Sequence, residues 1–241
     1  MQGMFFRSLI NCRRVPTLMS PWEVALIGKE IIRNPTPGAV VECGCFKGGS
    51  TATLSVACRK ANRILHVFDS FCGLPPTTNG DASHTVLSEN TIHHCEQGVF
   101  AGSLETVKAN VSKAGSLESC RFYSGFFEET LPRFKERLAV VFCDVDLVES
   151  LKTCLRYLWP LLGDGGALFT HEAHHLEVAK LFYNDVWWRQ NLSQNAPGLI
   201  GAGSGLGLSL RRHDGYHKSC LGMIRKNPAA KPIIESSSLA G

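Results

Sequence analysis

The distribution of hydrophobic residues along the chain predicts alternating strands and helices. Short unbroken apolar runs are typical of buried β-strands, and apolar residues spaced three or four positions apart are typical of helices. We predict strands over 39–43, 63–70, 119–125, 138–146 and 167–172. We predict helices over 20–34, 49–61, 102–115, 127–137, 148–162 and 174–192. This alternation predicts an α/β fold with a doubly wound, mostly parallel sheet.

Two segments near the C-terminus are expected to complete this sheet. The segments 198–212 and 219–226 are predicted to pair antiparallel at its edge, which brings the expected total to a seven-stranded sheet. The first of them contains "GLIGAGSGLGL", but Leu206 and Leu208 stand where a dinucleotide-binding G-x-G-x-x-G would need glycine. We therefore expect a tight sheet edge or a substrate-side loop there, and no second nucleotide site.

The segment 71–100 has no clear hydrophobic period. It is rich in Gly, Pro, Thr and Asn, and it contains three histidines, His84, His93 and His94. Long segments without secondary structure of their own are usually functional or mobile. We interpret this segment as a lid or substrate loop.

Composition narrows the class of protein. The 241 residues are within reach of one α/β domain, predicted over 1–228 with a tail over 229–241. The net charge of +4 is mild and the basic residues are scattered, which argues against a nucleic-acid partner. No apolar run is long enough to span a bilayer, and the first residues lack the features of a signal peptide. Ten cysteines without a C-x-x-C pair are typical of reduced thiols in a cytoplasmic protein.

Polar residues whose side chains can bind a ligand or take part in a reaction lie where predicted strands end. They are Glu42, Asp69, Asp144, and the pair His171 and Glu172. Right-handed crossovers place the C-terminal ends of parallel strands on one edge of a sheet, and ligands bind at that edge. We therefore expect these side chains to gather around one ligand site.

The stretch "VVECGCFKGGSTATLS" combines an acid, a glycine-rich turn and a helix start. Gly44 and Gly48 let the backbone approach a ligand, and the helix after them attracts negative charge. However, Phe46 stands where a dinucleotide fingerprint needs glycine, and it blocks the approach of a pyrophosphate. A carboxylate joined to an adenosine fits better. Asp69 follows after one strand–helix–strand unit, where an acid accepts hydrogen bonds from ribose hydroxyls.

The same stretch resembles motif I of class I S-adenosylmethionine-dependent methyltransferases. The variant is that of the macrocin O-methyltransferase family, which acts on sugars of macrolide antibiotics. "VFDSFCGLP", "GFFEETLP" and "CDVDLVESLKTCLRYLWPLLGDGG" are similar to further motifs of this family, in the right order. The resemblance covers roughly residues 20–192, and it implies a Rossmann-like methyltransferase fold and S-adenosylmethionine as the cofactor.

The resemblance also implies roles for individual residues. The methionine end of the cofactor would be held by Glu42, Gly44, Phe46, Gly48 and Ser50. The ribose would be bound at Asp69 and Ser70, and Asp144 would also lie at the cofactor. Ser124, Gly125 and Phe126 would lie near the adenine. For Phe126, packing in the core is an equally good interpretation.

Members of this family carry a divalent metal, usually magnesium, on three carboxylates. Asp144 matches the first, but His171 and Glu172 stand in place of two aspartates. An imidazole shifts the preference from magnesium toward manganese, iron or zinc. A magnesium or manganese ion on these three residues is expected; loss of the metal is the alternative. Asp146 is expected to begin the following helix rather than to bind the metal.

The segment "HEAHH" also matches the H-E-x-x-H spacing of zinc proteases. It follows a buried strand, whereas the protease motif lies within a helix, so we give this interpretation little weight. His174 and His175 add further nitrogen donors near the expected metal.

These observations predict an O-methyltransferase of natural product biosynthesis that acts on a hydroxyl of a sugar or another small diol. A metal would lower the pKa of the acceptor hydroxyl, and a histidine would take its proton. Asp144, His171 and His84 are the expected catalytic residues; further candidates for the base are His93, His94 and His174. A degenerate protein that binds S-adenosylmethionine without turnover and an NAD-dependent oxidoreductase remain alternatives, and a homo-oligomer remains open.

Overall fold

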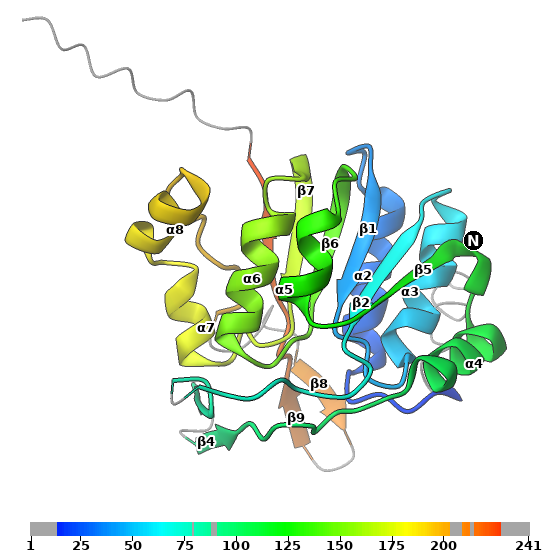
Figure 1. Cartoon of the computed structure of the whole chain (residues 1–241), viewed down its shortest axis with the longest axis horizontal. Helices are drawn as coiled ribbons and strands as arrows, with labels where there is room; N and C mark the ends of the chain where they lie inside the picture. The colour runs from blue at the N-terminus through cyan, green and yellow to red at the C-terminus, as the bar shows by residue number, and fades with distance from the viewer. Residues whose placement is uncertain (1–13, 79, 88–90, 203–208, 213–214, 228–241) are drawn as a thin grey trace, which may run out of the picture.

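The computed structural model describes residues 14–78, 80–87, 91–202, 209–212 and 215–227. Its centre is a six-stranded sheet with the order β10-β7-β6-β1-β2-β5 (Figure 1). The strands are β1 (Ala39–Cys43), β2 (Leu65–Asp69), β5 (Cys120–Ser124), β6 (Leu138–Cys143), β7 (Leu162–Thr170) and β10 (Gly222–Arg225). All neighbours are parallel except β10, which runs antiparallel to β7. The predicted α/β fold with a mostly parallel sheet is confirmed.

Helices cover both faces of this sheet. They are α2 (Pro21–Arg33), α3 (Gly49–Lys60), α4 (Leu104–Ala114), α5 (Phe127–Thr130), α6 (Val148–Leu158), α7 (Leu176–Leu181) and α8 (Asp185–Leu192). Val40 and Val140 pack with α2, α3 and α4, whereas Val41 and Val141 pack with α6, α7 and α8. Alternate residues of the central strands thus enter two separate cores, as expected for a parallel sheet that is buried on both faces.

Two predicted helices are shorter than expected. The segment 174–192 is divided into α7 and α8, because the Asn184 side chain accepts the backbone N–H of Trp187 and begins a new helix. The buried Trp188 then anchors α8 to the core. The segment 127–137 forms only α5 and a 3₁₀ turn, Leu131–Arg133, which contains Pro132.

The prediction of a seventh strand is wrong for the described residues. The segment 219–226 supplies β10, but its expected partner contributes one antiparallel bridge, between Ile200 and Met223. Gly198 and Gly201 have φ of 74° and 94°, which breaks the extended conformation on either side of Ile200. Strands β8 (Ser209–Arg212) and β9 (Gly215–Lys218) form a separate two-stranded sheet. Leu206, Leu208 and the tail 229–241 lie outside the described residues.

The segment 71–100 has more regular structure than its composition suggests. It contains an antiparallel hairpin of β3 (Ser83–Val86) and β4 (Thr91–His94). Glu177 at the start of α7 accepts the Thr85 N–H at 2.9 Å, and Val86 forms a bridge with His175. The hairpin is therefore docked onto the turn between β7 and α7. Its role as a lid stays a prediction.

Another contact joins the same segment to α6. The Asp81 carboxylate accepts the backbone N–H of Val148 at 2.9 Å and that of Glu149 at 3.3 Å. These groups belong to the first turn of the helix and have no partner within it. Asp81 thus caps a helix from which it is remote in the sequence. Within the ranges that the structure describes, no helix has the length and apolar character needed to cross a membrane.

Candidate functional site

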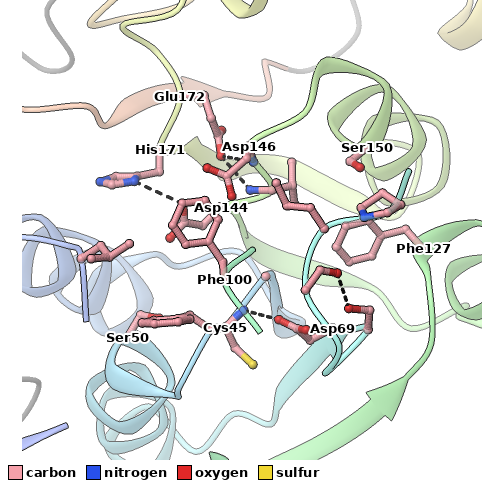
Figure 2. A pocket seen from close by; sticks show the side chains of 18 of the residues that line it. Cys45, Ser50, Asp69, Phe100, Phe127, Asp144, Asp146, Ser150, His171 and Glu172 are labelled. Carbon is pink, nitrogen blue, oxygen red and sulfur yellow. Dashed lines mark hydrogen bonds and ion pairs between the residues drawn. The ribbon is translucent and has the colours of Figure 1, made fainter. Parts of the chain in front are cut away.

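A cavity of about 290 Å³ lies where β1, β2, β6 and β7 end (Figure 2). Most of the predicted site residues line it: Gly44, Phe46, Ser50, Asp69, Ser70, Gly125, Phe126, Asp144, His171 and Glu172. Glu42, Gly48, Ser124 and His84 do not line it. The strand order thus gathers residues from distant parts of the chain at one edge, as expected from the topology.

The turn after β1 is fixed by close backbone contacts. Gly44 has φ of 81°, and a Cβ atom there would lie 1.8 Å from the carbonyl oxygen of Asp144. Phe46, with φ of 48°, adopts a left-handed conformation that is uncommon for residues other than glycine. Gly48, with φ of 84°, precedes α3 and faces Val107 of α4 rather than the cavity. Two glycines of the motif therefore shape the loop in different ways.

Glu42 lies beneath this loop and is fully buried. The Ser50 hydroxyl donates a hydrogen bond of 2.6 Å to its Oε1, while Oε2 has no partner. Burial raises the pKa of Glu42 to about 8. Ser50, which lines the cavity, therefore separates Glu42 from any ligand there, so Glu42 would act on a ligand through Ser50.

Asp69 joins the first two strand ends. Its Oδ2 accepts the backbone N–H of Cys45 at 2.7 Å, and its Oδ1 accepts that of Phe71 at 2.7 Å. Each oxygen keeps a lone pair for a further donor, and the side chain lines the cavity. The Ser70 hydroxyl instead donates to the Gly73 carbonyl at 2.7 Å, which stabilises the following turn.

Aromatic residues form much of the wall beside Asp69. The rings of Phe46 and Phe100 meet edge to face, 6.2 Å apart. Phe126 lines the cavity and belongs to neither apolar core, so of its two predicted roles the position favours ligand contact. Ser124 is exposed and lies outside the cavity.

An imidazole between two carboxylates lies at the other end of the cavity. His171 Nδ1 is 3.2 Å from Asp144 Oδ1, and His171 Nε2 is 3.5 Å from Glu23 Oε2. Burial alone lowers the pKa of His171, but Asp144 and Glu23 outweigh it and raise the pKa well above the usual value. Burial raises the pKa of Glu23, yet the hydrogen bond and charge of His171 lower it to about 2. Because both of its ring nitrogens face carboxylates, His171 is not free to act as a base.

Glu23 was not expected at this site. Its spacing from Ser20 predicts a capping box at the start of α2, and that box is present. The same carboxylate also accepts the Ser219 hydroxyl at 2.6 Å and reaches His171. The side chain thus links α2, the turn before β10 and the cavity.

Asp146 and Glu172 form a second acidic group beside Asp144 (Figure 2). Glu172 Oε1 accepts the backbone N–H groups of Val145 and Asp146, and the Thr170 hydroxyl donates to Oε2. Burial, and then the charge of Asp144, raise the pKa of Glu172 to about 7. The same two causes, followed by the charge of Glu172, raise the pKa of Asp146 to about 8.

The expected role of Asp146 is not observed. The residue before α6 is Leu147, and Asp81 supplies the carboxylate that caps the helix. Asp146 instead has φ of 59° and lines the cavity. The capping position is the residue immediately before the helix, and Leu147 there has no side chain that can cap, so a residue from another segment takes that role.

The predicted metal ligands do not fit a metal ion as they are placed. Both ring nitrogens of His171 face carboxylates, and both oxygens of Glu172 accept hydrogen bonds from their own turn. Among the described residues, groups of three donors within 4.8 Å of one another are found elsewhere. One group is Cys43, Cys143 and Cys154, which are enclosed in an apolar core. The other is His93, His174 and His175.

The histidine group lies on the cavity wall, where His93, His174 and His175 meet. His93 Nδ1 is 3.2 Å from His175 Nε2, and the rings of His174 and His175 are 4.0 Å apart. Burial, followed by repulsion from neighbouring histidines, lowers the pKa of His175 to about 2 and that of His174 to about 4. His84 is fully buried and stacks on His175 from behind, so it does not reach the cavity.

"HEAHH" forms a turn and not a helix. α7 begins at Leu176, after the last of its histidines. The helical spacing that a zinc protease needs is therefore absent, and His171 is paired with acids instead.

The profile of the macrocin-O-methyltransferase (TylF) family matches residues 19–195. The chain is 33% identical over 178 residues to the 8-demethyl-8-(2,3-dimethoxy-alpha-L-rhamnosyl)-tetracenomycin-C 4'-O-methyltransferase of Streptomyces olivaceus, covering 72% of this chain and 67% of the relative. It is 33% identical over 165 residues to the mycinamicin III 3''-O-methyltransferase of Micromonospora griseorubida, covering 66% of this chain and 62% of the relative. The matches therefore span about two thirds or less of the length of these curated relatives.

Solved structures show the same fold. The O-methyltransferase NovP superposes with a TM-score of 0.67 at 24% identity, over 88% of this chain and 82% of that one. The calicheamicin methyltransferase CalS11 superposes with a TM-score of 0.57 at 18% identity, over 85% of this chain and 77% of that one. At these identities the likeness concerns the arrangement of the sheet and its helices.

Proposed function

This chain belongs to the macrocin O-methyltransferase (TylF) family and is an S-adenosylmethionine-dependent O-methyltransferase, and we propose that it methylates a hydroxyl of a sugar on a natural product. The observation that supports a place for both the cofactor and an acceptor is the set of residues that line the cavity. Figure 2 shows Cys45, Ser50 and Asp69 on one side of the cavity and Asp144 with His171 on another. A cofactor and an acceptor can therefore lie end to end in one space.

The cofactor end is suited to an amino acid joined to a nucleoside. The N-terminus of α3 carries partial positive charge beside Ser50, which suits the carboxylate of the methionine part. Asp69 has lone pairs for the ribose hydroxyls. Phe126 and Gly125, after β5, would then lie against the adenine. S-adenosylmethionine supplies a methyl group that is already activated on its sulfonium.

The acceptor end supplies a base. The acceptor oxygen must lie in line behind the methyl group, and its proton must leave as the new bond forms. Asp144 lines the cavity and has one oxygen held by His171. We assign Asp144 as the acceptor of the hydroxyl proton. The acceptor O–H bond breaks as its oxygen forms a bond to the methyl carbon, and the bond from that carbon to the cofactor sulfur breaks, which leaves a neutral thioether. His171 and Glu23 position that carboxylate. No step passes through a metal on Asp144, His171 and Glu172.

The acceptor class rests on the relatives. One of them is named for methylation of a rhamnosyl-tetracenomycin, and another for 3''-O-methylation of mycinamicin III. A sugar hydroxyl is therefore the proposed acceptor, and another small diol would satisfy the same chemistry. The cysteines of the described ranges are all free, which fits the proposed cytoplasmic location.

The first test is calorimetric titration of S-adenosylhomocysteine into the protein, with EDTA and then with magnesium or manganese. We expect micromolar binding under each condition. Transfer of a labelled methyl group to a panel of rhamnosylated compounds then tests the acceptor class. Binding without transfer to any hydroxylated acceptor would favour a non-catalytic protein that binds the cofactor. Binding of NADH in place of S-adenosylhomocysteine would favour an oxidoreductase.

A further inference from the structure

Three histidines from two distant segments meet on the wall of the cavity. His93 comes from β4, and His174 and His175 come from the turn between β7 and α7 (Figure 1). One ring nitrogen of each lies within 4.8 Å of the other two. His93 and His175 are 82 residues apart in the sequence, so the fold and not local chain geometry brings these rings together.

The spacing of the nitrogens matches that around a metal ion. Two imidazole ligands of a tetrahedral ion, each at 2.0–2.1 Å, are ~3.3 Å apart. His93 Nδ1 and His175 Nε2 are 3.2 Å apart. Without an ion, one of these nitrogens must carry a proton and donate to the other. With an ion, both nitrogens would offer their lone pairs to the same centre.

Two buried nitrogens of this group, Nδ1 of His174 and Nδ1 of His175, have no hydrogen-bond partner among the described residues. His175 is only 4% exposed. Buried polar atoms are usually hydrogen-bonded, so the unpartnered nitrogen of His174 favours a ligand at this place. The ion would bind His175 through the Nε2 that faces His93, and not through its Nδ1.

The backbone around the histidines is already fixed. Val86 forms a bridge with His175, and the Leu87 N–H donates to the His174 carbonyl at 2.9 Å. Glu177 accepts from both the backbone and the hydroxyl of Thr85. Because these contacts hold the hairpin against the turn, an ion would bind to side chains whose backbones need not move.

We propose that His93, His174 and His175 bind a divalent transition-metal ion such as Zn²⁺. Three imidazoles suit zinc and its neighbours in the first transition row, whereas magnesium prefers oxygen ligands. Three protein ligands leave a fourth position open toward the cavity, as in zinc sites that bind water or a substrate hydroxyl. His84, stacked on His175 with its Nδ1 3.8 Å from Glu177, supports the group from behind.

This site does not depend on the proposed acceptor or base, and it is separate from the acidic group at Asp144. An ion there would join the hairpin to the turn before α7. It would therefore stabilise the wall of the cavity as well as offer a position to a ligand.

The test measures metal binding directly. The protein is stripped with EDTA, desalted and titrated with ZnCl₂ by calorimetry, and with CoCl₂ while visible absorption is followed. We expect one Zn²⁺ per chain, and Co²⁺ absorption typical of four-coordinate nitrogen ligation. His93→Ala is expected to weaken Zn²⁺ binding by about 100-fold, because one of three ligands is lost.

His94→Ala is the matched control, because His94 is the next residue of the same strand, is exposed, and lies outside the group. It is expected to bind Zn²⁺ as the unmodified chain does. Zn²⁺ is also expected to raise the Tm of the chain and of His94→Ala but not of His93→Ala. Binding of S-adenosylhomocysteine by each variant checks its fold.

Two results would overturn the proposal. One is equal Zn²⁺ affinity in the unmodified chain and His93→Ala. The other is loss of Zn²⁺ binding in Asp144→Asn with full binding in His93→Ala, which would place the ion at the acidic group. Neither result depends on methyl transfer, so failure of this proposal and failure of the proposed function remain distinguishable.

Discussion

The two ends of the cavity are built in different ways. At the cofactor end, backbone contacts fix the loop: Gly44 permits a close contact, and Asp69 accepts hydrogen bonds from two backbone N–H groups. At the acceptor end, side chains from separate segments hold one another, as in the row of Glu23, His171 and Asp144. The glycine-rich loop after β1 makes the first arrangement recognisable in the sequence. The second exists only once the tertiary structure has formed.

The largest expected effect concerns the acceptor end. Asp144→Asn keeps the shape of the side chain but removes the proposed base, so we expect kcat to fall by about 10²–10⁴-fold. Binding of S-adenosylhomocysteine, measured by calorimetry, is expected to stay within a few-fold. Asp164→Asn is the control, because Asp164 is an exposed acid on the same sheet. Unchanged methyl transfer by Asp144→Asn would remove this residue from the mechanism.

A glycine substitution tests the cofactor end. Gly44→Ala places a Cβ atom 1.8 Å from a backbone oxygen, so we expect a loss of about 3 kcal/mol or more in the free energy of unfolding, or failure to fold. Gly98 has the same φ of 81° with nothing within 4 Å of its Cβ position. Gly98→Ala is therefore expected to cost only the ~1–2 kcal/mol of the left-handed conformation. Equal losses in urea unfolding would show that the close contact is unimportant.

The ion pair of Glu23 and His171 gives the acceptor end a pH dependence. The raised pKa of His171 contributes stability that is complete below about pH 6.5 and is lost as the pH rises through the folded value. The lowered pKa of Glu23 contributes stability that is present above about pH 4.5 and is lost as the pH falls toward 2. The joint contribution is therefore largest between these limits.

A double-mutant cycle measures this pair. Glu23→Gln and His171→Gln, alone and together, are expected to give a coupling energy of ~1–3 kcal/mol near pH 6, decreasing as the pH rises. Unfolding in urea at several pH values supplies the free energies. A coupling energy near zero at pH 6 would mean that the two residues are neighbours without a charge interaction.

The smallest effect is expected at the cap of α6. Asp81→Ala removes the acceptor of two backbone N–H groups, which typically costs ~0.5–2 kcal/mol. Ser103→Ala, at the start of α4, removes a cap that lies next to its own helix and serves as the comparison. Both losses are measured as shifts in the urea midpoint. If only Asp81→Ala also weakens ligand binding, segment 71–100 is coupled to the cavity.

The same contrast explains how far the sequence was informative. Strands β1, β2, β5 and β6, helices α2 and α3, and the loop after β1 follow from local spacing, so they were predicted closely. Strand β7 begins five residues earlier than predicted, at Leu162, and the strands β3 and β4 were not predicted. Glu23 could be recognised only as a helix cap, because its contact with His171 joins residues that are far apart in the sequence. The break between α7 and α8 depends on one Asn184 cap, and the missing seventh strand depends on Gly198 and Gly201. Such features are decided by single residues within otherwise regular patterns.

The capping contact of Asp81 couples the first turn of α6 to local opening of the segment 71–100. The first amides of α6 find their acceptor on the segment beside the cavity, so any opening of that segment exposes them to solvent. The rate of hydrogen–deuterium exchange at the amides of Val148 and Glu149 then measures opening of this segment, although these amides belong to a helix. A ligand that holds the segment closed slows exchange at these two amides. Their protection against exchange therefore reports whether the cavity is occupied.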